Sequence, residues 1–459
     1  MKTRCFLFVL VLCAPFSALG EEFQVNVRTT GSQANPALAL TGTGDVIAVW
    51  SSYYSSSGRS NEIIARRLSL DGAIGDSEEF QVNVTCEGNQ TEPDVAADGR
   101  GGFLVVWQGP GPNEEDIFLR RFDPNGQPLS DQRLVNSYTP GRQLFPRIAG
   151  NDRGAFVVIW ESRGPADEAG RALVCARCFD PNAAALGEPF VVDEDSYDCR
   201  YPDVAMDDEG GFVATWVQDR TSKTVFGRRF EPNGTAAATP FEISRIGCSS
   251  MTRPSIAMSA GGRFVVAWDG DPNRASDDDI HARLYDPNAT PLTEPFLVNT
   301  ACEGAQQWPR AAMNEAGEFV IVWMHETSDP NLNTDIHARR FGRDGVPAGG
   351  ALQVNTYVLG KQQYPAAAMT DDGAFVTAWE DQEPDSGGYD VWACIAAPLI
   401  SADFNGDLRV SFIDWASFAL HWRQQDLPAP TDLNDDGIVD ARDVAAFCRQ
   451  WLRERNEEY

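Results

Sequence analysis

Apolar residues recur along the chain in short runs that each end at a tryptophan. Two of these runs are Phe103-Leu-Val-Val-Trp107 and Phe156-Val-Val-Ile-Trp160. The tryptophans lie 52 to 57 residues apart, at Trp50, Trp107, Trp160, Trp216, Trp268, Trp323 and Trp379. Each of them follows a proline by 14 residues. The chain therefore contains seven copies of one repeat unit, and repeats of this length indicate a repeat architecture.

Each unit offers four short strand candidates, separated by turns rich in Gly, Pro, Asn and Asp. Ten residues before most of the repeat prolines a segment such as Phe23-Gln-Val-Asn26 ends, with looser copies at Phe190 to Asp193 and Phe241 to Ser244. After the tryptophan comes a mixed segment, as in Asp116 to Phe122. We therefore predict one four-stranded sheet for every repeat unit.

The strand that ends at each tryptophan is apolar at consecutive positions, so both of its faces should be covered. A two-layer sandwich would leave one face of an outer strand in water and produce alternation instead. A ring of stacked four-stranded sheets covers both faces of every sheet. The segment after the tryptophan carries arginines beside small apolar residues, which favours a more exposed strand nearer the rim.

The two ends of the repeat region complement each other. The chain begins its repeats with the segment at Phe23, and the last repeat stops after Asp390 to Cys394 without such a segment. Pairing the first segment with the last sheet would remove two exposed sheet edges. The prediction is an all-β, closed seven-bladed β-propeller over about residues 21–399. The repeat resembles propellers generally, because the signatures of the kelch and WD repeats are absent.

The N-terminus has the pattern of a secretory signal peptide. Lys2 and Arg4 precede an apolar run from Phe6 to Phe16 and a small-residue pattern that ends at Gly20. We therefore assign residues 1–20 as a signal peptide. No later segment approaches the roughly 20 apolar residues that a membrane-spanning helix needs. The mature protein is expected to be secreted, extracellular or at the cell surface, without membrane insertion.

Composition narrows the range of partners. Hydrophobic residues make up 42% of the 459 residues, as in a folded globular protein, and 67 acidic against 37 basic residues give a net charge of −30. Such a charge repels phosphate backbones and anionic lipid, so nucleic acid is not expected as a partner. We expect a monomer. Eight of the ten cysteines follow the signal peptide, which makes some disulfides plausible. Cys175 and Cys178 lie within one predicted strand and face opposite ways, which favours a structural role for both.

Two acidic loops near the C-terminus have the spacing of calcium sites. Each places oxygen ligands at positions 1, 3, 5, 7, 9 and 12, with the main-chain carbonyl at position 7. The predicted ligands are Asp403, Asn405, Asp407, Arg409, Ser411 and Asp414 in the first loop, and Asp432, Asn434, Asp436, Ile438, Asp440 and Asp443 in the second. Each loop leads into an amphipathic helix pattern, with Trp415 and Trp422 in one and Trp451 in the other. We predict that Ca²⁺ is the cofactor of this segment.

With two calcium loops, each followed by a helix and neither preceded by one, residues 401–455 resemble a type I dockerin. That resemblance implies a small α-helical module that docks in a calcium-dependent manner to a cohesin-type partner, often to attach polysaccharide-degrading enzymes to a scaffold. The sequence departs from the family at Leu408, which replaces the turn glycine of the first loop, whereas Gly437 keeps it in the second. The first loop is therefore expected to bind calcium more weakly.

Catalytic motifs are absent from the sequence, which contains no G-x-S-x-G elbow, no H-E-x-x-H and no phosphate-binding glycine loop. Glu161, Asp269 and Glu380 directly follow a repeat tryptophan, and His325 has no counterpart in the other repeats. Drifting surface loops explain these residues better than a catalytic site does, so no catalytic residue is assigned. The sequence favours a secreted, non-catalytic binding or scaffold protein whose propeller presents a face for carbohydrate or protein. The alternative is a glycoside hydrolase for polysaccharide, delivered by the dockerin-like module.

Overall fold

A computed structural model describes residues 19–54, 60–70, 78–163, 170–193, 195, 197–220, 223–244, 253–270, 278–300, 303–327, 334–382 and 388–397. The chain divides into two compact units. One is Glu21–Ile395, and the other combines Met1–Gly20 with Ala396–Tyr459. Residues 1–18 of the predicted signal peptide and all of the predicted calcium loops lie outside the described residues.

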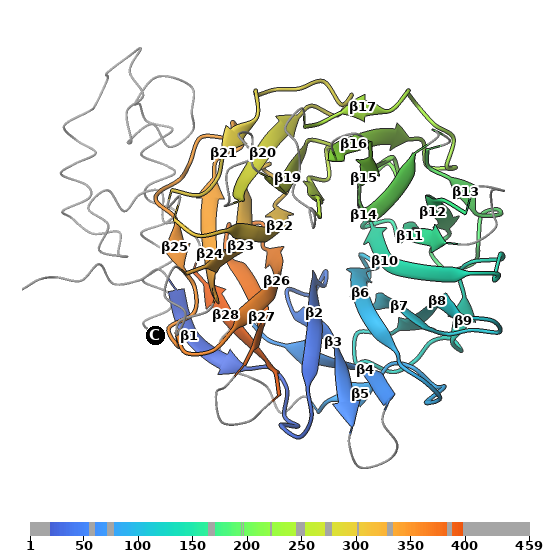
Figure 1. Ribbon diagram of the computed structural model, residues 1–459. Helices are drawn as coiled ribbons and strands as arrows, with labels where there is room; N and C mark the ends of the chain where they lie inside the picture. The colour runs from blue at the N-terminus through green and yellow to red at the C-terminus, as the bar shows by residue number, and fades with distance from the viewer. Residues whose placement is uncertain are drawn as a thin grey trace, which may run out of the picture. The chain divides into compact units, whose positions relative to one another are not determined.

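The described residues of the unit Glu21–Ile395 form seven antiparallel sheets of four strands each. Figure 1 shows them arranged in a ring, with the first strand of each sheet nearest the centre. These first strands are β2 (Gln33–Leu40), β6 (Thr91–Ala97), β10 (Arg142–Gly150), β14 (Asp198–Met206), β18 (Ser255–Met258), β22 (Gln306–Met313) and β26 (Gln362–Met369). The predicted seven-bladed β-propeller is confirmed.

The second strands form the hydrophobic layers between the sheets. They are β3 (Val46–Tyr54), β7 (Phe103–Pro110), β11 (Phe156–Arg163), β15 (Phe212–Asp219), β19 (Phe264–Gly270), β23 (Phe319–Glu326) and β27 (Phe375–Asp381). All seven repeat tryptophans lie on these strands and are at most 1% exposed. Because neighbouring sheets cover both faces, consecutive apolar residues are buried here, as the sequence pattern predicted.

The third strands carry the repeat arginines. They are β4 (Ser60–Leu68), β8 (Glu115–Phe122), β12 (Ala172–Phe179), β16 (Lys223–Phe230), β20 (Asp279–Tyr285), β24 (Thr334–Phe341) and β28 (Asp390–Ala396). The arginines extend to the preceding sheet rather than into water. Each of five donates a hydrogen bond of 2.7 to 2.9 Å to a carbonyl there: Arg66 to Val25, Arg120 to Val82, Arg177 to Val135, Arg228 to Val192 and Arg339 to Val298. They therefore connect adjacent sheets, a role that their polarity alone did not indicate.

The fourth strands are short and lie at the rim. They are β5 (Phe80–Gln81), β9 (Arg133–Leu134), β13 (Phe190–Val191), β17 (Phe241–Glu242), β21 (Phe296–Leu297) and β25 (Leu352–Gln353), while β1 (Leu19–Gln24) is the fourth strand of the last sheet. Most of them pair with the third strand through only two residues, so side chains just after the fourth strand must supply further contacts.

A repeated asparagine latches the fourth strand to the third. The Oδ1 atom of Asn136 accepts a 2.8 Å hydrogen bond from the Ile117 amide, and its Nδ2 atom donates to Asp116 at 2.7 Å. Asn355 makes the same pair of bonds, to Ile336 and Asp335. In the fourth sheet Ser244 stands at this position and accepts from Val225 at 3.2 Å. The looser copy at Phe241 to Ser244 therefore keeps the main-chain contact.

The same latch closes the ring. Val25 donates its amide to the Val391 carbonyl at 2.8 Å, Asn26 accepts from the Val391 amide at 2.7 Å, and Asn26 donates to Asp390 at 2.8 Å. β1 thereby completes the sheet formed by β26, β27 and β28 (Figure 1). The predicted closure by the N-terminal strand is confirmed.

The cysteines that the structure describes are free thiols, so the disulfides that the sequence made plausible do not occur among them. They are Cys86, Cys175, Cys178, Cys199 and Cys394, whereas Cys248, Cys302 and Cys448 lie outside the described residues. Burial raises the pKa of Cys175 to about 12 and that of Cys178 to about 11. Because the thiolate is the reactive form, both side chains are inert packing groups. Within the described part of the chain, no helix is long and apolar enough to cross a membrane.

The asparagine latch can be tested by comparing Asn26→Leu with Asn136→Leu. Each substitution leaves a main-chain amide and a carboxylate without their hydrogen-bond partner. This loss should lower the free energy of unfolding by about 1 to 3 kcal/mol. Asn26→Leu should lower the melting temperature more, because the latch of Asn26 closes the ring, whereas Asn136 lies within a continuous stretch of the chain. Equal, negligible losses in circular-dichroism melts would contradict the latch.

Candidate functional site

A central cavity of about 200 Å³ lies where the first strands of the sheets converge. Its lining comes from the first strands of all seven sheets and includes four of the repeat prolines, Pro36, Pro93, Pro309 and Pro365. Phe145 and Tyr201 line a small neighbouring hollow instead, together with Arg147, Arg253 and Arg310. The residue before the proline and the residue after it thus form two successive layers. The residue after the proline lines the cavity in all seven sheets, and the residue before it does so in five.

The residue before the proline has an unusual backbone conformation. In six of the seven sheets its φ lies between 51° and 60°, at Asn35, Glu92, Phe145, Tyr201, Trp308 and Tyr364. Bulky residues rarely adopt this left-handed region, and a following proline disfavours helical backbone further. The six sheets also share a register shift at this point, which marks a β-bulge. Each such residue costs about 1 to 3 kcal/mol in backbone strain, which the contacts around it must offset.

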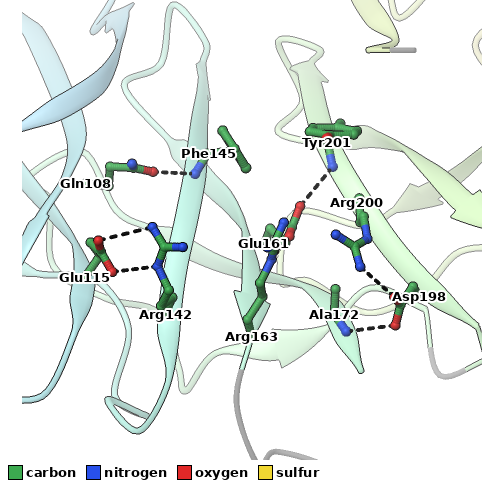
Figure 2. A network of polar contacts seen from close by, with 10 residues as sticks. All are labelled: Gln108, Glu115, Arg142, Phe145, Glu161, Arg163, Ala172, Asp198, Arg200 and Tyr201. Carbon is green, nitrogen blue, oxygen red and sulfur yellow. Dashed lines mark hydrogen bonds and ion pairs between the residues drawn. The ribbon is translucent and has the colours of Figure 1, made fainter. Parts of the chain in front are cut away.

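At three of the six turns this contact comes from the residue after the tryptophan of the preceding sheet. Figure 2 shows Gln108 and Glu161 directed at the amides of Phe145 and Tyr201, with hydrogen bonds of 2.8 and 3.4 Å. Glu380 accepts a 2.6 Å bond from the Asn35 amide in the same way. The sequence analysis assigned the acids after the tryptophans to drifting surface loops, and that expectation is wrong: Glu161 and Glu380 are buried on β11 and β27, where they accept the amides of strained turns. Asp269 differs only in accepting from Arg253 of its own sheet, at 3.3 Å.

Burial shapes the acidity of two of these carboxyl groups. It raises the pKa of Glu380 to about 7 and that of Asp269 to about 7. Glu161 is fully buried as well but forms an ion pair with Arg163 (Figure 2). The three repeat-equivalent acids therefore differ in their electrostatic surroundings while sharing one structural position.

Arg253 stands before the repeat proline of the fifth sheet and lies among aromatic rings. Its guanidinium carbon is 4.4 Å from the centre of the Trp308 ring, 5.0 Å from that of Phe145 and 5.1 Å from that of Tyr201. Trp308 in turn packs edge-on against Tyr364, with ring centres 4.3 Å apart. Cation–π contact fixes the plane of the guanidinium group. We call Phe145, Tyr201, Arg253, Trp308 and Tyr364 the aromatic cage.

The layer behind the aromatic cage alternates in charge. The residues after the prolines are Ala37, Asp94, Arg147, Asp203, Ser255, Arg310 and Ala366. The carboxylates of Asp94 and Asp203 accept amides of the following sheets, from Ile148 at 2.9 Å and from Ile256 at 3.0 Å. Burial raises the pKa of Asp94 and, helped by the charge of Arg147, lowers that of Arg310 to about 10.

The other end of the ring has an acidic cavity of about 340 Å³. Asp152, Asp208, Glu315 and Asp371 line it. The charge of Asp371 raises the pKa of Glu315, and burial together with Asp208 raises that of Asp152. Most of the chain's negative charge is spread elsewhere, but these four acids make the two ends of the ring electrostatically distinct.

His325 does not line either cavity. It sits half-buried on β23 beside Gln306, and its ring centre is 4.8 Å from that of His337. Burial lowers the pKa of His325 and lowers that of His337 to about 4, so both rings are neutral near pH 7. No group of three or more His, Cys, Asp or Glu residues suited to a metal ion occurs among the described residues. The twelve predicted calcium ligands, from Asp403 to Asp443, lie outside that part of the chain.

Sequence reasoning identified the repeat prolines but not the residues beside them. A signal was available, because the position before the proline is occupied in turn by Asn, Glu, Phe, Tyr, Arg, Trp and Tyr. Large, dissimilar side chains at one fixed position of a repeat indicate a shared scaffold with a variable surface. The left-handed backbone that directs them into the cavity could not be read from residue types.

Comparison with known proteins supports the fold. No protein-family profile and no curated protein matches this chain. A protein of unknown function from Dyadobacter fermentans DSM 18053 has 10% identity over 82% of this chain and 97% of its own, with a TM-score of 0.51. An ulvan lyase of a new polysaccharide-lyase family has 9% identity over 79% of this chain and 93% of its own, with a TM-score of 0.50. The α-L-arabinanase of Penicillium chrysogenum, bound to arabinobiose, has 11% identity over 82% of this chain and 98% of its own, with a TM-score of 0.46. At such identities, the likeness shows the propeller fold alone.

The raised pKa of Glu380 predicts a pH-dependent effect of Glu380→Gln. The folded state holds the proton more tightly than the unfolded chain, whose glutamate pKa is about 4.3. The wild type therefore loses stability as pH rises from about 4 to about 7. Glu380→Gln, which can still accept the Asn35 amide, should match the wild type at pH 4 and exceed it by about 2 to 3 kcal/mol at pH 8.

Chemical denaturation at the two pH values measures this difference. Glu161→Gln is the matched control, because it weakens the ion pair with Arg163 and should lower stability at pH 8. A stability gain for Glu380→Gln that is the same at pH 4 and pH 8 would contradict the raised pKa.

Proposed function

We propose that this protein is a secreted, non-catalytic binding protein that holds a small carbohydrate ligand in the central cavity of its propeller. The observation that carries the proposal is the aromatic cage, which repeats one backbone geometry but places a different side chain in almost every sheet. A few polar groups among aromatic side chains in a preformed hollow are typical of ligand sites. The strained turns are held in place before any ligand arrives, which favours preorganised binding.

The carboxylates near the cavity support binding more than catalysis. A glycosidase needs one carboxyl group as acid and a second as base or nucleophile. Asp94 and Asp203 each accept a main-chain amide of the next sheet, and Glu92 lies 3.9 Å from the Arg253 guanidinium. Groups that fix the scaffold in this way are poorly suited to accept and release protons at a substrate.

A glycoside hydrolase is the second candidate, and one observation favours it. Asp94 has a raised pKa and lies in the same cavity as Asp203, as a general acid and its partner would. If this function holds, Asp94→Asn should abolish hydrolysis of the bound saccharide while leaving its binding unchanged.

For the C-terminal segment, we propose a dockerin-like calcium module over residues 401–455. The support is the sequence: two loops, at 403–414 and 432–443, carry the same oxygen spacing and the same following helix pattern. The module would attach the propeller to a cohesin-like partner. Together with the signal peptide, this gives a monomeric extracellular or cell-surface protein that carries a bound saccharide to a scaffold.

The binding proposal is tested by screening the full mature chain against an array of plant, algal and bacterial glycans. We expect binding to a small group of saccharides and no release of reducing ends on prolonged incubation. Trp308→Ala should reduce the bound signal, whereas Tyr138→Ala, at the rim, should not. Complete absence of bound glycan would argue for a passive spacer, and product release would favour the hydrolase.

The calcium proposal is tested by titrating the full mature chain with Ca²⁺ in a calorimeter. Two sites are expected, the second loop binding more tightly than the first because Leu408 replaces the turn glycine. Asp432→Ala should remove the tighter site and Asp403→Ala the weaker one. Glu209→Ala, on the surface of the propeller, should leave both unchanged, and a chain that shows no heat of calcium binding would rule the module out.

A further inference from the structure

We infer that the central cavity recognises an oxyanion on a sugar ring, a carboxylate or a sulfate ester, through the guanidinium groups of Arg147, Arg253 and Arg310. This inference rests on the proposed binding function and specifies its ligand class. The three arginines come from three different sheets: Arg147 from β10, Arg310 from β22, and Arg253 from the segment that leads into β18. All three line the same cavity of about 200 Å³.

The guanidinium groups of these arginines make few hydrogen bonds within the described part of the chain, although Glu92, Asp94 and Asp203 line the same cavity. Among the described residues, none of the three donates a hydrogen bond to a carboxylate. Arg147 donates to the Pro146 carbonyl at 2.9 Å, and the closest approach of an acid to Arg253 is 3.9 Å, from Glu92. The nearby carboxylates of Asp94 and Asp203 are instead occupied by main-chain amides. Burying guanidinium groups without hydrogen-bonded partners is costly, so a bound anion would satisfy them.

Mutual repulsion indicates that the three groups converge. Burial lowers the pKa of Arg310 to about 10; the charges of Arg147 and Arg253 also lower it, while those of Asp203 and Asp94 raise it. Burial likewise lowers the pKa of Arg253, with Glu92 raising it and Arg147 lowering it. Like charges held this close in one hollow are relieved by an anion placed between them.

The aromatic cage leaves the hydrogen-bonding edge of Arg253 available. The guanidinium carbon of Arg253 lies over the rings of Trp308, Phe145 and Tyr201. The Nε atom of Arg253 is buried and has no hydrogen-bond partner among the described residues. A guanidinium that stacks through its face keeps its in-plane N–H groups for a two-point contact with a carboxylate or sulfate.

Size and net charge restrict the ligand further. The cavity is smaller than the roughly 300 to 1,000 Å³ of sites for drug-sized ligands, so it suits a single sugar ring. The chain as a whole carries a charge of −30, which repels extended polyanions at long range. The preferred ligand is therefore a short saccharide or chain end with one acidic ring, rather than a nucleic acid or a densely charged polymer.

The inference is tested by calorimetry on the full mature chain with matched probes. Galacturonate is compared with its methyl ester, and glucose 6-sulfate with glucose, so that the members of each pair differ at the anionic group and share the sugar ring. The acidic member should bind at least about 10-fold more tightly, as loss of charge-assisted hydrogen bonds implies. The two pairs also show whether the anion is a carboxylate or a sulfate.

Variants locate the binding groups. Arg310→Gln and Arg253→Gln should each weaken binding of the preferred acidic probe by at least about 10-fold. Arg153→Gln, which removes an exposed arginine paired with Glu209, should bind as the wild type does. Melting curves establish that each variant is folded, and the comparison of acid with neutral probe on the wild type does not depend on any variant.

Two results would overturn the inference. The first is equal affinity for the charged and neutral member of both pairs, and the second is unchanged affinity in folded Arg310→Gln and Arg253→Gln. If a neutral glycan from the array binds while neither acidic probe does, the oxyanion is ruled out but the binding function stands. If no glycan binds at all, both proposals fail.

Discussion

The ring depends on the hydrogen bonds that join one sheet to the next, because each fourth strand is too short to hold itself. Two main-chain pairs are a weak attachment, and in five sheets the asparagine after the strand adds one bond to a main-chain amide and one to an acidic side chain, as Asn136 does. The arginine of the next sheet then holds the carbonyl of the residue before that asparagine. Once these side chains are in place, the apolar second strands are covered on both faces and the tryptophans leave water.

The same contacts explain why the first strand of the chain belongs to the last sheet. Asn26 makes with Asp390 and Val391 the bonds that Asn136 makes with Asp116 and Ile117. Closure therefore uses the same interaction that Asn83, Asn136, Asn299 and Asn355 make in other sheets. An open ring would expose an edge of β28 and an edge of β1, which is unfavourable for a strand-rich protein.

The fold was largely predictable, and the candidate site was not. Tryptophan and proline at a fixed spacing determined the number of sheets, and consecutive apolar residues required cover on both faces. The site depends on backbone dihedral angles at residues such as Phe145 and Trp308, which pattern does not encode. The sequence also could not separate Glu380 from a catalytic acid, because its role depends on a contact with Asn35, some 345 residues away. Arg66 and its counterparts were assigned to the rim for their polarity, whereas their partners are carbonyls of a neighbouring sheet.

The left-handed turn before each proline has a consequence for how such a protein can diversify. Asn, Glu, Phe, Tyr and Trp all occupy this turn with nearly the same φ, so the backbone there is indifferent to the side chain it bears. Recognition and folding are thereby assigned to separate residues of the repeat. Substitutions at this position can therefore change ligand specificity one side chain at a time, while the strands of the propeller stay as they are.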